Sequence, residues 1–113
     1  MDVPSPQVGA AVCEAIRTQV ARLGLSIGDE PSWAAVQLSE KTDPFSKESS
    51  LIATWRGSAR YGTATFFADG RVFAEYQVLQ PHPRLVGQFV EAVQVWGTPD
   101  ALRGDVVLME MPA

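Results

Sequence analysis

The sequence predicts an α+β fold of two layers, in which an antiparallel sheet of about five strands carries two helices on one face. Three features predict it: apolar residues at helical spacing near both ends, alternation of apolar and polar residues in the middle, and turn signals between the alternating segments. The expected order of elements is α-β-β-β-β-α-β. A length of 113 residues matches a single globular domain, residues 1–113.

The first helix is predicted over residues 6–23. Ser5 can cap it, Pro6 suits its first position, and Gly24 supplies the stop. Apolar side chains recur every three or four residues and form one stripe, which consists of Val8, Val12, Ala15, Ile16, Val20 and Leu23. Cys13 flanks this stripe, and we interpret it as a packed residue rather than a reactive thiol.

A strand over residues 33–39 follows, with Ala34, Val36 and Leu38 on one side. The polar residues 40–50 then predict a mobile loop. Phe45 inside that loop has two interpretations, an anchor that folds back onto the domain or an exposed contact.

The middle of the chain predicts a three-stranded meander, because Gly57-Ser58 and Asp69-Gly70 separate segments rich in aromatic and β-branched residues. The strands are expected at 51–56, 59–67 and 71–79. If both turns have two residues, the expected facing pairs are Phe67 with Val72, Phe66 with Phe73, Thr63 with Tyr76, Ile52 with Thr63, and Trp55 with Arg60. A slip of one residue would exchange the two faces of a strand.

The last third of the chain predicts a helix and a strand. Residues 83–96 carry apolar side chains at helical spacing, with Gly97 behind them. Residues 105–111 are apolar on both sides, which is typical of a buried strand.

The predicted register divides the meander into two faces. The face assigned to the core carries Leu51, Ala53, Trp55, Gly62, Ala64, Phe66, Phe73 and Leu79, with Arg60, Glu75 and Gln77 as its polar members. The opposite face carries Ile52, Thr54, Arg56, Tyr61, Thr63, Thr65, Phe67, Val72, Tyr76 and Val78. Because two helices cover only one side of a sheet, this second face is expected to be an interaction surface, most simply in a homodimer. The alternative is that the 40–50 loop, or the first strand with the chain ends, folds over it.

The residues expected to form an interface, or a platform for a small ligand, are Thr54, Arg56, Tyr61, Thr63, Phe67, Tyr76 and His82. No phosphate-binding glycine loop, nucleophile elbow or Cys-x-x-Cys motif is present, so no catalytic residue is assigned. His82 lies between two prolines and is interpreted as a turn residue, the alternative being a general base.

Composition narrows the functional class. One cysteine and one histidine cannot form an internal disulfide or a zinc site, so neither a metal nor a cofactor is expected. A net charge of −4 disfavours binding to nucleic acid. The lack of a long apolar run disfavours a membrane span, and the N-terminus has no signal-peptide pattern, so a cytoplasmic location is expected.

The sequence therefore predicts a non-catalytic protein-interaction domain that acts as a homodimer, and its expected partners are itself and another protein. Chaperones, inhibitor or immunity proteins and assembly factors include small acidic domains of this architecture. The alternative is a small-ligand-binding protein or enzyme that uses a pocket between sheet and helices.

Overall fold

The computed structural model describes residues 4–22, 24, 32–57, 60–78, 80–81 and 88–110. In this part of the chain, helix α1 (Pro6–Arg22) and the short 3₁₀ turn η1 (Trp33–Ala35) precede a series of strands. The strands are β1 (Gln37–Thr42), β2 (Ser49–Gly57), β3 (Arg60–Phe67), β4 (Val72–Val78), β5 (Gln80–Pro81), β6 (Gln88–Thr98) and β7 (Ala101–Glu110).

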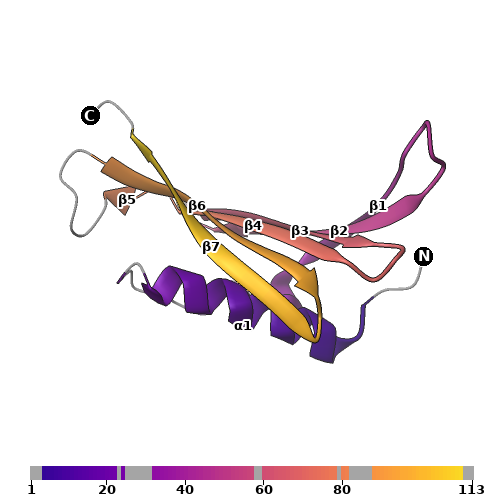
Figure 1. Ribbon diagram of the computed structural model, residues 1–113, viewed down its shortest axis with the longest axis horizontal. Helices are drawn as coiled ribbons and strands as arrows, with labels where there is room; N and C mark the ends of the chain where they lie inside the picture. Colours follow the sequence, from indigo (N-terminus) through magenta and orange to yellow (C-terminus); the bar gives the residue numbers. More distant parts are fainter. Residues whose placement is uncertain are drawn as a thin grey trace.

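All the strands belong to one antiparallel sheet in which neighbours along the chain are mostly neighbours in space. The order is β1-β2-β3-β4-β6, with β7 along the other edge of β6. The two-residue β5 pairs with the start of β6 and continues the line of β4, so the sheet is effectively six strands wide. Helix α1 lies across one side of the sheet, over β4, β6 and β7 (Figure 1).

The predicted α+β class and antiparallel sheet are confirmed, but the predicted second helix is wrong. Residues 88–96 of the expected helix 83–96 belong to β6, while its residues 83–87 lie outside the described part of the chain. Val93 and Val95 point into the core, while Gln94 and Trp96 point away, which is the alternation of a strand. The β-branched residues of this segment favour a strand over a helix, and pairing with β4 on one side and β7 on the other stabilises the strand.

The predicted first helix is confirmed at Pro6–Arg22. The Ser5 hydroxyl oxygen accepts a hydrogen bond from the backbone N–H of Val8 at 3.3 Å, which satisfies one of the free donors of the first turn. The side chains of Val12, Ile16 and Val20 are fully buried against the sheet. Cys13 is buried beside them, and burial raises the pKa of its thiol to about 11 although nearby Arg17 opposes the shift.

A second packing centre covers the β2–β3 end of the same side of the sheet. Trp33 from η1 contacts Trp55 and Phe66, with ring centroids 6.4 Å and 5.7 Å apart. The Trp55 indole N–H donates to the carbonyl of Ser32 at 2.8 Å, so the polar atom of this buried ring is satisfied. The predicted contact of Trp55 with Arg60 is wrong, because Trp55 faces Gly62 and Arg60 faces Gly57.

The predicted register between β3 and β4 is wrong by one residue. The Gly70 N–H donates to the Phe67 carbonyl and the Phe67 N–H donates to the Arg71 carbonyl, so three residues form the loop instead of two. Gly70 occupies the left-handed region at φ 93°, where a side chain would be strained. Phe66 therefore faces Val72, and Gly62 faces Tyr76.

This one-residue shift exchanges the two faces of β4. Val72, Tyr76 and Val78 lie in the core, whereas Phe73 lies on the opposite side. The Tyr76 ring fits because it faces Gly62, whose missing side chain would otherwise lie 2.5 Å from the ring. The predicted register of β2 with β3 is also wrong, but by two residues, so the faces of these strands are as predicted.

The predicted strand 33–39 and the predicted loop 40–50 each differ in part from the observed structure. Trp33–Ala35 form the 3₁₀ turn, and β1 runs through Gln37–Thr42 into a short turn at residues 43–48. The β1–β2 hairpin extends beyond α1 and bends away from it, toward the side of the sheet that the helix leaves uncovered (Figure 1).

Candidate interaction surface

The side of the sheet opposite α1 is covered by none of the described elements (Figure 1). We call it the open face. Its side chains come from alternate residues of the paired strands. They are those of Gln37, Ser39, Lys41, Ser50, Ile52, Thr54, Arg56, Tyr61, Thr63, Thr65, Phe67, Phe73, Glu75, Gln77, Gln94, Trp96, Arg103 and Asp105.

The register aligns these side chains in rows that run across the strands. The aromatic row consists of Ser39, Ile52, Thr65, Phe73, Trp96 and Arg103. The neighbouring amide row consists of Gln37, Thr54, Thr63, Glu75, Gln94 and Asp105. Shorter rows flank them, Lys41-Ser50-Phe67 on the aromatic side and Arg56-Tyr61-Gln77 on the amide side.

Large rings are exposed along this face. The exposed fractions are 37% for Phe67, 41% for Phe73, 38% for Trp96 and 40% for Tyr61. Phe67, Phe73 and Trp96 lie in the aromatic row or beside it, whereas the amide row separates Tyr61 from them.

Arginine side chains hold two of these rings in place. The Arg56 guanidinium carbon lies 5.6 Å from the centre of the Tyr61 ring, and that of Arg71 lies 5.2 Å from the centre of the Phe67 ring. The Arg71 Nε also donates to the Asp69 carboxylate at 2.6 Å. Rings fixed in this way lose less conformational freedom when a partner binds.

In the amide row, two side-chain hydrogen bonds centre on the Glu75 carboxylate. The Glu75 carboxylate accepts from the side-chain N–H groups of Gln94 at 3.2 Å and Gln77 at 3.5 Å. Thr54 and Thr63 face one another on the adjacent strands. The hydroxyl and amide groups of this row can bond to a second polar surface at a lower desolvation cost than its two carboxylates, Glu75 and Asp105.

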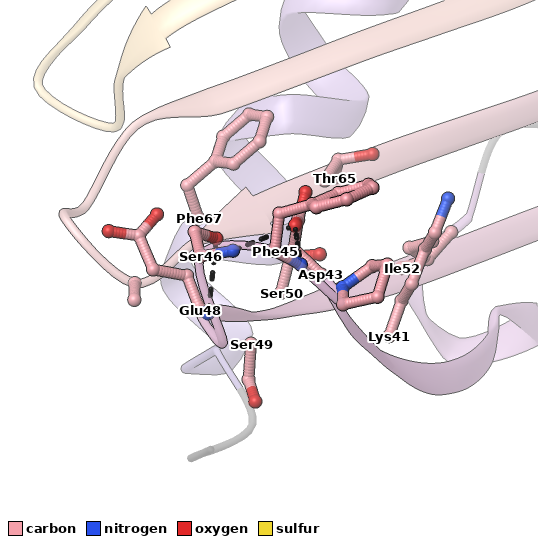
Figure 2. Close-up of a pocket in the computed structure, with 12 residues that line it drawn as sticks. Lys41, Asp43, Phe45, Ser46, Glu48, Ser49, Ser50, Ile52, Thr65 and Phe67 are labelled. Carbon is pink, nitrogen blue, oxygen red and sulfur yellow. Dashed lines mark hydrogen bonds between the residues drawn. The ribbon is translucent and has the colours of Figure 1, made fainter.

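The turn at residues 43–48 carries the most exposed large apolar residue of the described chain. Phe45 is 94% exposed, so the interpretation as an anchor folded back onto the domain is wrong, and the exposed contact stays a prediction. The Asp43 carboxylate accepts from the backbone N–H groups of Phe45 at 2.8 Å and Ser46 at 3.0 Å, and Lys47 adopts φ 63° (Figure 2). These N–H groups hold the pKa of the Asp43 carboxyl below its usual value, that of Ser46 most strongly.

A cavity of about 400 Å³ lies between this turn and the open face. Phe45, Ser46 and Lys41 line it from the hairpin, and Ile52, Thr65 and Phe67 line it from the sheet (Figure 2). Its lining offers apolar rings, hydroxyls, a lysine and the carboxylates of Asp43 and Glu48. It can therefore accept a side chain that has both apolar and polar atoms.

Five of the seven predicted surface residues lie together on the open face: Thr54, Arg56, Tyr61, Thr63 and Phe67. Tyr76 does not join them, because the shifted register places it in the core at 1% exposure. His82 lies outside the described residues. Phe73 and Trp96 are members that the sequence analysis missed, since it assigned one to the core and the other to a helix.

The described residues contain no group of three or more His, Cys, Asp or Glu side chains placed to hold a metal ion. In the same part of the chain, no helix is long and apolar enough to cross a membrane. No protein-family model, curated protein or solved structure matches the chain. Functional inference therefore depends on the geometry of the open face.

Proposed function

We propose that this protein is a non-catalytic protein-interaction domain that acts as a homodimer, with the open face as the contact between copies. The observation that carries the proposal is the set of four partly exposed rings on one uncovered sheet face. Tyrosine, tryptophan, phenylalanine and arginine are the residue types most enriched where proteins meet. A second copy is the simplest partner because twofold assemblies are the commonest.

The size of the open face fits this role. On one face, side chains repeat at about 6.8 Å along a strand and about 4.8 Å across strands, so two rows of six residues and two rows of three cover on the order of 600 Å². That lies at the lower end of the roughly 600–1,000 Å² that each partner contributes to a stable interface of standard size. The functional class proposed is that of chaperones, inhibitors or assembly factors, by analogy of size, acidity and architecture.

Light scattering coupled to size exclusion tests the proposal on the whole chain and on the Phe73→Glu variant. The native chain, 12.2 kDa as a single copy, should elute at twice that mass in the tens of micromolar. Phe73→Glu should elute as a single folded copy, because its carboxylate would be buried against apolar rings. Ala10→Glu adds the same charge on the exposed side of α1 and should leave the dimer intact.

A native chain that remains a single copy at these concentrations would contradict the homodimer. If a metabolite screen then raised the melting temperature of that single copy, the small-ligand alternative would replace it.

A further inference from the structure

We infer that the second copy packs face to face on the open face, about a twofold axis that runs parallel to β3 and β4 and lies between them. This inference rests on the proposed homodimer and adds its geometry. When the same sheet face meets itself, the twofold axis must lie in the plane of the contact. In a regular sheet the axis can then run along the strands or across them.

An axis along the strands keeps each row opposite the same row of the second copy and reverses the strand order. In the aromatic row, Ile52 then faces Trp96 of the second copy, and Thr65 faces Phe73 of the second copy. Every large apolar side chain of this row therefore meets another side chain of the same row, so the contact buries the exposed rings in a dry centre.

The amide row is self-complementary under the same operation. Thr63 faces Glu75 of the second copy, and Thr54 faces Gln94 of the second copy. A hydroxyl can donate to the carboxylate, and a hydroxyl and an amide can bond in either direction. No carboxylate of one copy comes opposite a carboxylate of the other, so the row supplies hydrogen bonds without like-charge repulsion.

An axis across the strands gives a poorer match. When this axis lies midway between the two long rows, it keeps the strand order but places the aromatic row of one copy on the amide row of the other. Phe73 would then cover the Glu75 carboxylate of the second copy, and Trp96 would cover Gln94. This axis would also pair Arg103 with Asp105 of the second copy at the sheet edge, but an exposed ion pair contributes little to the free energy of association. Burial of the Glu75 carboxylate against a ring is costly by comparison.

The β1–β2 hairpin supports the same axis. It bends toward the open-face side (Figure 1), and the reversed strand order brings it over the β6–β7 turn of the second copy. Phe45 would then contact residues 98–101 of that copy, and Lys41 would lie near its Asp100. This contact would bury the exposed Phe45 and place opposite charges together.

Single-cysteine variants joined by a short bismaleimide test the direction of the axis. Ser39→Cys and Arg103→Cys lie at opposite ends of the aromatic row. With sheets about 10 Å apart and strands about 4.8 Å apart, an axis along the strands separates identical positions at these ends by roughly 26 Å, whereas Ser39 and Arg103 of different copies come within about 12 Å. The native Cys13 is buried and does not compete.

The expected result is an efficient crosslink when the two variants are mixed and none when either is treated alone. A covalent dimer formed by either variant on its own would overturn this axis and favour the axis across the strands. Dimer mass without any crosslink would also overturn the inferred arrangement while leaving the homodimer intact. Single-copy mass for both variants and for the native chain would overturn the proposed function itself.

Discussion

The two faces of the sheet are formed by alternate residues of the same strands, and they differ in composition and in burial. The covered face is apolar and buried, with Ala53, Ala64 and Ala74 fully buried at its centre and the rings of Trp55, Phe66 and Tyr76 beside them. The open face instead combines rings of about 40% exposure with threonines, amides and arginines.

This difference separates the requirements of folding from those of binding. A face that packs against its own chain needs small residues at its centre and no unpaired polar group. A face that is first solvated and later covered needs rings that tolerate water and polar groups that can bond in both states. The open face meets the second set of requirements, which is why we propose it as the interaction surface.

The largest expected effect comes from placing the same charge on either face at adjacent residues. Ala64→Asp buries a carboxylate among apolar side chains and should lower the free energy of unfolding by at least about 3 kcal/mol. Thr65→Asp, on the open face, should change the stability of a single copy by no more than about 1 kcal/mol but abolish the dimer. Urea denaturation and light scattering measure the two effects.

Equal losses of stability for Ala64→Asp and Thr65→Asp would show that the open face is also packed, and the distinction between the two faces would fail.

A smaller effect is expected from removing one exposed ring. Trp96→Ala should weaken the dimer by about 2 kcal/mol, roughly a 30-fold rise in the dissociation constant, because a central tryptophan is typical of a binding hot spot. Leu38→Ala is the matched control, since Leu38 is 41% exposed against 38% for Trp96 but points to the other side of the sheet. Sedimentation over a concentration series measures both constants.

If the Leu38→Ala and Trp96→Ala variants weakened association equally, the contact would not be specific to the open face.

The smallest effect concerns the turn that presents Phe45. Hydrogen bonds from backbone N–H groups lower the pKa of the Asp43 carboxyl in the folded chain, so its stabilising contribution is present above the ordinary carboxyl pKa and is lost as the pH falls through the lowered one. Asp43→Asn keeps an acceptor oxygen but cannot ionise. Its stability should therefore depend less steeply on pH in the acid range than that of the native chain, as measured by denaturation at several pH values.

Parallel pH curves for the native chain and Asp43→Asn would show that the Asp43 carboxylate does not stabilise the turn.

Local signals predicted the first helix and the central strands because their periodicity depends only on neighbouring residues. The stripe from Val8 to Val20 and the capping Ser5 suffice for α1. The register of β4 was not predictable in this way, because Asp69-Gly70 suits a two-residue loop and a three-residue loop equally. Tyr76 and Phe73 exchanged faces as a result.

The second error, at residues 88–98, has a different cause. Val90, Val93 and Trp96 fit helical spacing, and Val93 and Val95 also fit a strand. Pairing with β4 and β7 decides between helix and strand for this segment. A short window of sequence does not show which distant strands will pair with it. The missed Phe73 and Trp96 follow from these two errors, whereas Thr54, Arg56, Tyr61, Thr63 and Phe67 were found because β2 and β3 kept their predicted faces.

The most direct test of the account is the exposure of open-face protons to a soluble paramagnetic relaxation agent, measured by NMR at low and high protein concentration. We expect Thr63, Thr65, Phe73 and Trp96 to lose most of their relaxation enhancement as concentration rises, while exposed Ala10 and Thr18 on α1 keep theirs. Enhancement at the open face that stays constant while the molecule is demonstrably dimeric would contradict the claim that this face is the contact.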